Sequence, residues 1–114
     1  MSTYDNLPVY KVSYDLLLEL FCFTKNFSRE YKFTIGESIK NETINMITNI
    51  YRANSAQSSR KDMIQLAREN TETIRLFLRL LKDLKQINLE KFIRLNEKIE
   101  SVSKQLAAWH RSSK

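Results

Sequence analysis

The near absence of glycine and proline is the feature that most limits how this chain can fold. One of each occurs in 114 residues, namely Gly36 and Pro8. The tight turns between β-strands depend on glycine and proline, so a chain with so few of them can hardly form an all-β fold. Long helices with few connections need neither residue. The sequence therefore predicts an all-α protein.

Apolar residues recur at helical spacing in four stretches. The first begins near Leu7, where Pro8 suits the first helical turn because its missing N–H would have no partner there. The other three are expected at 29–53, 60–85 and 89–110, each after a polar residue that can cap a helix: Ser28, Ser59 and Asn88. Four helices joined by short loops predict one domain, residues 1–114, folded as an antiparallel up-down-up-down four-helix bundle.

Two local features refine this prediction. Ser59 followed by Asp62 resembles a capping box, in which each side chain accepts a backbone N–H of the other's turn. Gly36 lies inside the second helix, where glycine costs about 1 kcal/mol against alanine. Close approach of a neighbouring helix would explain the glycine, and plain tolerance of it is the alternative.

The first and third helices carry more apolar surface than one core can cover. In the stretch from Ile74 to Ile87 the apolar side chains span an arc of roughly 200°, about twice what a helix on the surface of a monomer needs. The helix beginning near Leu7 has a similar arc. Monomers rarely leave so large an apolar patch in water. We therefore expect a homo-oligomer that closes into a ring.

Positive charge is confined to the second half of the chain. The net charge is +6. Residues 59–87 hold seven Lys and Arg against four Asp and Glu, and residues 88–114 hold six against three, whereas residues 1–58 hold six of each. Such asymmetry indicates an anionic partner. A soluble surface that is merely rich in lysine is the alternative.

Four basic residues of the third helix fall in a strip roughly 60° wide beside the apolar arc. This basic ridge consists of Arg68, Arg75, Arg79 and Lys82, and a second basic cluster on the fourth helix consists of Lys91, Arg94 and Lys98. Arginine favours phosphate and carboxylate through its planar fork, so we interpret both sets as a surface that binds nucleic acid or a protein partner.

A solvated face with local salt bridges is the alternative for the basic ridge. Glu72 lies three residues before Arg75, at the spacing of a helical ion pair. If the ridge binds a partner instead, Arg75 and Arg79 face away from the core, and both can be replaced without loss of structure.

No residue set for catalysis or for a cofactor is recognisable. The chain has one histidine, His110, and one cysteine, Cys22. A di-iron bundle needs Glu-x-x-His on two helices, and a zinc site needs more Cys and His than these. No glycine-rich phosphate loop occurs. We expect no enzyme activity, no metal and no cofactor; the rival hypothesis is a small hydrolase or nuclease that uses His110.

The single cysteine excludes an internal disulfide and fits a reducing compartment. No charged-then-apolar leader opens the chain, and no run of about 18 apolar residues is present. We therefore expect a cytoplasmic protein without a membrane partner.

The order and spacing of several motifs resemble the accessory variability determinant proteins of diversity-generating retroelements. The matching stretches are Leu7-Pro-Val-Tyr-Lys-Val-Ser-Tyr-Asp-Leu-Leu-Leu, Phe27 with Tyr31-Lys32-Phe33, Gly36 and Ile39, Arg75-Leu-Phe-Leu-Arg-Leu-Leu-Lys-Asp-Leu, and Trp109. The resemblance spans nearly the whole chain. Extra loop residues around Ala56 to Ser59 depart from the family pattern.

This resemblance implies a four-helix bundle that assembles into a barrel-shaped homopentamer with a basic surface. It also implies binding to a reverse transcriptase and to RNA or DNA, in support of mutagenic cDNA synthesis, without catalysis by the protein itself. Proteins encoded in intervening sequences of bacterial ribosomal RNA genes are similar in fold and length, and their role is unknown. That branch and a purely structural helical adaptor are the alternative functions.

Overall fold

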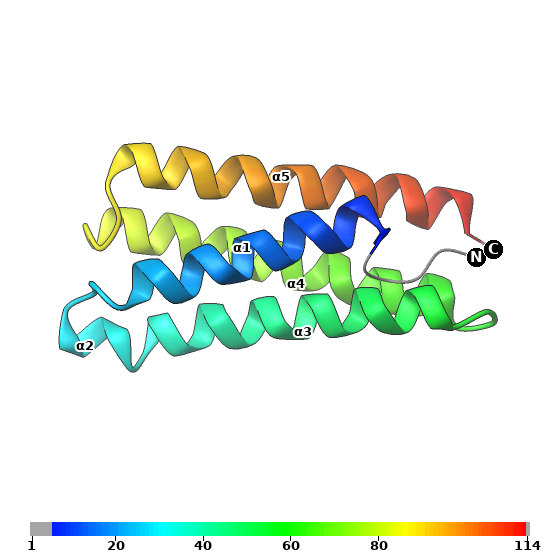
Figure 1. Cartoon of the computed structure of the whole chain (residues 1–114), viewed down its shortest axis with the longest axis horizontal. Coiled ribbons are helices and arrows are strands. Elements are labelled where there is room, and N and C mark those ends of the chain that lie inside the picture. The colour runs from blue at the N-terminus through cyan, green and yellow to red at the C-terminus, as the bar shows by residue number, and fades with distance from the viewer. Residues whose placement is uncertain (1–5, 114) are drawn as a thin grey trace.

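The computed structural model describes residues 6–113, and these form four long helices and one short one. The helices are α1 (Pro8–Thr24), α2 (Arg29–Lys32), α3 (Ile35–Ser55), α4 (Arg60–Asp83) and α5 (Leu89–Ser112). The four long helices run alternately up and down, so α1 begins and α5 ends at the same end of the bundle (Figure 1). The predicted all-α bundle is confirmed, and the described part of the chain contains no strand.

Each long helix packs on two others. α1 lies against α3 and α5, and α4 lies against α3 and α5, so α1 and α4 occupy opposite corners of the bundle. One apolar stripe from every long helix points to the common centre, because residues three and four apart share a helix face. The largest fully buried side chains of this core are Leu16, Leu20, Ile39, Met46, Ile50, Ile64, Ile74, Leu78, Leu81, Leu95, Ile99 and Leu106.

The second predicted helix is broken, which the sequence pattern did not indicate. The short α2 ends at Lys32, and Phe33 and Thr34 separate it from α3; Thr34 has non-helical dihedral angles, φ −116° and ψ −97°. Its hydroxyl donates a hydrogen bond to the carbonyl of Glu30 over 2.8 Å. The break has no glycine or proline of its own, so nothing in the local sequence marks it.

Gly36 lets this broken segment pack tightly. A Cβ at Gly36 would lie 3.1 Å from the carbonyl oxygen of Tyr31 and 3.4 Å from the ring of Phe27. The close approach is made by the short helix α2 and by the turn before it, which favours the first of the two explanations given for Gly36. Phe27, with 6% of its surface exposed, joins the core at this end of the bundle.

The helix caps are partly as predicted. Asn88 caps α5, since its side chain accepts the Lys91 backbone N–H over 2.8 Å. The predicted capping box at Ser59 is wrong, because the Ser59 side chain makes no capping hydrogen bond. Arg60 instead reaches back and donates from Nε to the carbonyl of Ala53 over 2.8 Å. Its guanidinium thereby satisfies a carbonyl at the end of α3, which would otherwise lack a helical partner.

A chain of polar side chains crosses from α3 to α4. Asn49 donates from Nδ2 to Asn70 Oδ1 over 2.9 Å, and Asn70 donates from Nδ2 to Glu42 Oε2 over 2.7 Å. All three residues are partly buried. Because each partner sits at one position along its helix, these hydrogen bonds favour one register of α3 on α4.

Replacing Asn70 with alanine should lower the free energy of unfolding by about 1–3 kcal/mol, because Asn49 and Glu42 would each lose a hydrogen bond in a partly buried place. Urea unfolding followed by circular dichroism at a fixed protein concentration measures the change. Asn45→Ala is the matched control, since Asn45 is exposed on α3 and hydrogen-bonds to no side chain among residues 6–113. Equal losses in both variants would contradict the role of the polar chain.

Candidate nucleic-acid interface

The basic ridge of α4 lies along its junction with α5. Arg75 spans this junction: its Nε lies 2.6 Å from Glu100 Oε2 and its Nη2 lies 2.9 Å from Glu100 Oε1. Arg75 also pairs with Glu72 on its own helix. Hydrogen bonding with Glu100 is the main reason that the pKa of Arg75 is raised and the pKa of Glu100 is lowered. Arg75 is therefore held between two carboxylates and not displayed alone, contrary to expectation.

The other ridge residues differ in how much of their charge stays available. Lys82 Nζ lies 4.8 Å from the ring centroid of Phe92 on α5, within cation–π range. Arg79 is exposed and makes no ion pair with any residue from 6 to 113. Of the four, Arg79 presents the most accessible charge.

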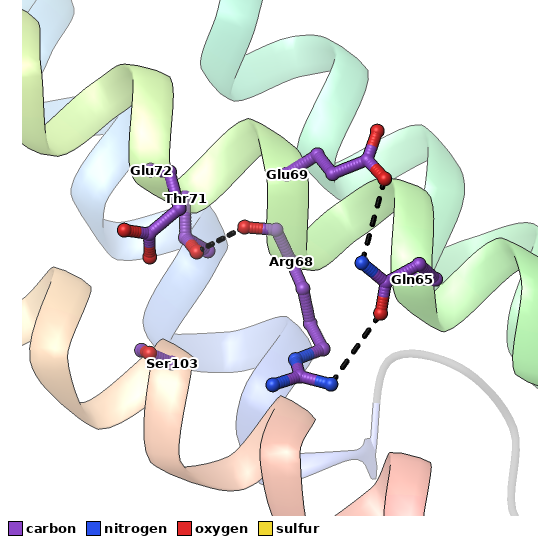
Figure 2. Close-up of a pocket in the computed structure, with 6 residues that line it drawn as sticks. All are labelled: Gln65, Arg68, Glu69, Thr71, Glu72 and Ser103. Carbon is purple, nitrogen blue, oxygen red and sulfur yellow. Dashed lines mark hydrogen bonds between the residues drawn. The ribbon is translucent and has the colours of Figure 1, made fainter.

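Arg68 lies beside a shallow hollow of about 170 Å³ between α4 and α5. Figure 2 shows its side chain running from α4 toward α5, with the guanidinium donating to Gln65 over 3.4 Å. Glu69 accepts from the same Gln65, over 3.4 Å, and does not pair with Arg68. Ser103 of α5 lines the opposite wall. Glu69 and Glu72 also line the hollow, but neither forms an ion pair with Arg68.

The second basic cluster faces α1, on the other side of α5. Lys91 Nζ lies 5.0 Å from the ring centroid of Phe23. Arg94 Nε and Lys98 Nζ lie 2.6 Å and 3.3 Å from the two carboxylate oxygens of Glu19, which is mostly buried. The Arg94 contact is an ion pair without the alignment of a hydrogen bond.

The structure therefore separates the seven predicted residues into two rows on opposite sides of α5. The α4 row contacts Glu100 and Phe92 of α5, and the α5 row contacts Glu19 and Phe23 of α1. Helical periodicity predicted that each row shares a face of its own helix, but not that acidic and aromatic side chains lie opposite. The salt bridge of the alternative interpretation, Glu72 with Arg75, is present.

His110 lies near Lys61 and Arg68, a grouping that the sequence analysis did not predict. The pKa of His110 is lowered from its usual 6.5, first by loss of hydration and then by the charges of Lys61 and Arg68. This lowering favours the neutral form of the imidazole, which lies near two cations. The available signal was the seven-residue spacing of Lys61 and Arg68, which places both on one face of α4.

Among residues 6–113, no group of three or more His, Cys, Asp or Glu is placed to hold a metal ion. None of the helices in that part of the chain combines the length and the apolar character that crossing a membrane requires.

The bAvd-like family model matches residues 9–113. The chain belongs to the bAvd-like family. This membership confirms the resemblance to accessory variability determinant proteins. A solved structure, described as a protein of unknown function from the S23 ribosomal protein family of Bacteroides thetaiotaomicron VPI-5482, has the same fold. It superposes with a TM-score of 0.83 at 20% sequence identity, over 91% of this chain and 96% of that one. No curated protein matches the sequence.

Acid should remove the contribution of the Arg75–Glu100 pair to stability. A carboxyl pKa that is lowered on folding stabilises the protein above its ordinary value of 4.5, and the gain disappears as the pH falls below that value. Because both side chains are partly exposed, we expect a coupling of about 0.5–1 kcal/mol at pH 7.

A double-mutant cycle with Arg75→Gln and Glu100→Gln, unfolded in urea at pH 7 and at pH 3, measures this coupling. Glu72 remains in all four proteins as a constant background. A coupling that is absent at pH 7, or equally large at pH 3, would contradict the assignment.

Proposed function

We propose that this chain is a non-catalytic accessory protein of a diversity-generating retroelement, which binds RNA or DNA and the reverse transcriptase during mutagenic cDNA synthesis. Membership of the bAvd-like family supports the accessory role. The cytoplasm is the proposed site of action. The alternative is the unknown role of proteins encoded in ribosomal RNA intervening sequences. The S23 structure does not support this alternative, because a similarity at 20% identity shows the fold alone.

The observation that carries the nucleic-acid part of the proposal is the location of the charge. Residues 59–114 supply the whole net charge of +6, and this half of the chain contains α4 and α5, which pack side by side. One side of the bundle therefore attracts polyanions, whereas the α1 and α3 side is balanced. No base-reading motif occurs on α4 or α5, so binding is expected to depend little on nucleotide sequence.

Two other functional classes make different predictions. A hydrolase or nuclease that uses His110 would lose its activity in His110→Ala, whereas the accessory role leaves nucleic-acid binding intact in that variant. A purely structural adaptor would bind its partners independently of salt. A reverse transcriptase gene with paired variable and template repeats beside this gene would favour the retroelement branch.

Exposed apolar stripes support the proposed ring. Tyr14, Leu18 and Phe21 recur along α1 at spacings of four and three, and Leu76 and Leu80 recur along α4; all five side chains are at least 41% exposed. Since α1 and α4 occupy opposite corners, these stripes face different directions. Two unlike apolar faces on one chain suit a head-to-tail contact, which closes into a ring. The family resemblance sets the proposed number of chains at five.

Light scattering should give five times the chain mass of 13.5 kDa, or about 67 kDa. Leu18→Gln should shift the protein to smaller species, because it places an amide in the apolar contact. Asp15→Asn, an exposed polar change on the same helix, is the control and should leave the mass unchanged. A stable species of one chain at micromolar concentration in the wild-type protein would overturn the ring.

Nucleic-acid binding should weaken uniformly, and depend less on salt, when the accessible ridge charges are removed. In Arg68→Gln/Arg79→Gln the slope of log affinity against log salt should become shallower by about 1.8 for duplex and about 1.4 for single strands, because each phosphate contact releases condensed counterions. Fluorescence anisotropy between 50 and 200 mM salt, a range of about fourfold, suffices to measure the slope.

The matched control for this variant is Lys11→Gln/Arg52→Gln, which removes the same charge from exposed positions of α1 and α3. It should keep nearly the wild-type slope. Equal effects of the two double variants would mean that net charge, and not the ridge, determines binding. If protein and RNA share the ridge, Arg68→Gln/Arg79→Gln should also weaken a reverse transcriptase complex.

A further inference from the structure

The end of the bundle formed by the α1–α2 and α4–α5 turns is built as one surface. The backbone N–H and the hydroxyl of Ser28 both donate to Gln86 Oε1, over 2.9 Å and 3.1 Å. Gln86 is held in turn by the chain before it: its Nε2 donates to the Leu84 carbonyl over 3.1 Å, and Lys85 has a left-handed backbone with φ 61°. Turns far apart in the sequence are therefore fixed beside each other.

Phe33 projects from this end at the break between α2 and α3. Phe33 is 63% exposed and lines an open hollow of about 380 Å³. The buried ring of Phe27 and the side chains of Arg29 and Lys32 line the same hollow. Lys32 Nζ lies 6.0 Å from the Phe33 ring centroid. An aromatic ring with cations around it is thus presented to solvent.

This end of the bundle carries four cations that have no carboxylate partner among the described residues, and Glu30, exposed on α2, pairs with none of them. Lys25, Arg29 and Lys32 lie on or beside α2, and Lys85 lies on the turn that Ser28 holds beside it. None of these four cations forms an ion pair with another residue in the range 6–113, whereas Arg75 and Arg94 are each paired. We call Lys25, Arg29, Lys32, Phe33 and Lys85 the end surface.

We propose that the end surface is a binding site for single-stranded nucleic acid, in which an unpaired base stacks on Phe33 while Arg29 and Lys32 contact the flanking phosphates. Every base has a π-face, so stacking on an exposed aromatic ring needs no particular sequence. A duplex keeps its bases stacked within itself and offers only phosphates to the same surface. The site therefore discriminates single strands from duplex, which the ridge charges of α4 do not.

The observations favour nucleic acid over an apolar peptide or a second copy of the chain. Arg29 and Lys32 line the same hollow as the exposed ring, and neither forms an ion pair within residues 6–113. An apolar partner would leave these charges without counterions or would bury them at a cost. A chain of phosphates with intervening bases satisfies both the ring and the cations. This inference deepens the proposed function and rests on it.

The test compares affinities of the full chain for labelled oligo(dT) and oligo(U) of 12 nucleotides, a length of about one single-strand binding site, and for a DNA duplex of equal length. Phe33→Ala should weaken single-strand binding about five- to 150-fold and leave duplex binding unchanged. Phe33→Leu should lose as much, and Phe33→Trp should restore wild-type affinity. Arg29→Gln/Lys32→Gln should reduce the single-strand salt slope by about 1.4.

Leu89→Ala is the matched control, because Leu89 lies after the same α4–α5 turn and is 64% exposed but has no ring. It should bind both ligands as the wild type does. Since Phe33 is exposed, its variants should keep the wild-type helix content, and Phe33→Leu keeps an apolar side chain at the position.

Three negative outcomes can be told apart. If the wild-type protein binds single strands and Phe33→Ala binds them equally well, the end surface is wrong and the proposed function stands. If the wild-type protein binds neither nucleic acid, the proposed function fails and the inference fails with it. If Phe33→Ala changes the oligomeric mass and leaves affinity per chain unaltered, the surface is a contact between copies and the inference is overturned.

Discussion

Burial of one apolar stripe on each long helix is the constraint on which the rest of this structure depends. The buried residues of α4 include Ile64, Ile74, Leu78 and Leu81. Because successive side chains on a helix point 100° apart, burial of these residues fixes the direction of every other side chain of α4. Asn70 then meets α3 on one side and Arg75 meets α5 on the other. Leu76 and Leu80 are left facing water. The buried core, the ion pairs and the exposed apolar stripe of α4 thus all follow from how this helix is rotated about its own axis.

The same rotation of α4 limits how much positive charge the basic ridge presents to a partner. Arg75 lies near the middle of the ridge and has two carboxylates, Glu72 and Glu100, as partners. The charge of Arg75 is therefore less available to a partner than the charges of Arg68 and Arg79, which lie on either side of it along α4 and form no ion pair within residues 6–113. A partly exposed pair of this kind contributes about 1 kcal/mol or less to stability, so the main effect of Glu100 is on the charge pattern rather than on the fold.

The sequence predicted the features that depend on one helix alone, and it did not predict the contacts between helices. The periodicity of apolar residues is a property of each helix by itself, so the four long helices, the Asn88 cap and the wide apolar arcs could all be predicted. Contacts between helices also depend on which side chains the neighbouring helix places opposite. Glu19 pairs with Arg94 from 75 positions away, and no spacing rule connects them. The displayed ridge was inferred from α4 alone, and α5 supplies the partners that modify it.

The break before α3 shows a different limit. Local propensity favours a continuous helix through Phe33 and Thr34, since neither is a strong helix breaker. Burial of Phe27 against Gly36 competes with that preference, because the ring and the Tyr31 carbonyl occupy the space beside the first turn of α3. Tertiary packing of this kind overrides propensities of a few tenths of a kcal/mol per residue.

Assembly and the end surface can reinforce each other in the proposed ring. The apolar stripes lie on the flanks of the bundle, on α1 and α4, whereas Phe33 directly follows α2, which lies at one end of the bundle (Figure 1). A contact between flanks leaves the ends open, and a closed ring with its rotation axis along the bundles places every Phe33 on the same rim. One strand could then contact several copies in succession. Each further contact is intramolecular, with an effective concentration in the millimolar range for short spans, so weak single sites give tight overall binding. Tolerance of any base sequence at each site then becomes useful, because repetition of the site and not base recognition supplies the affinity.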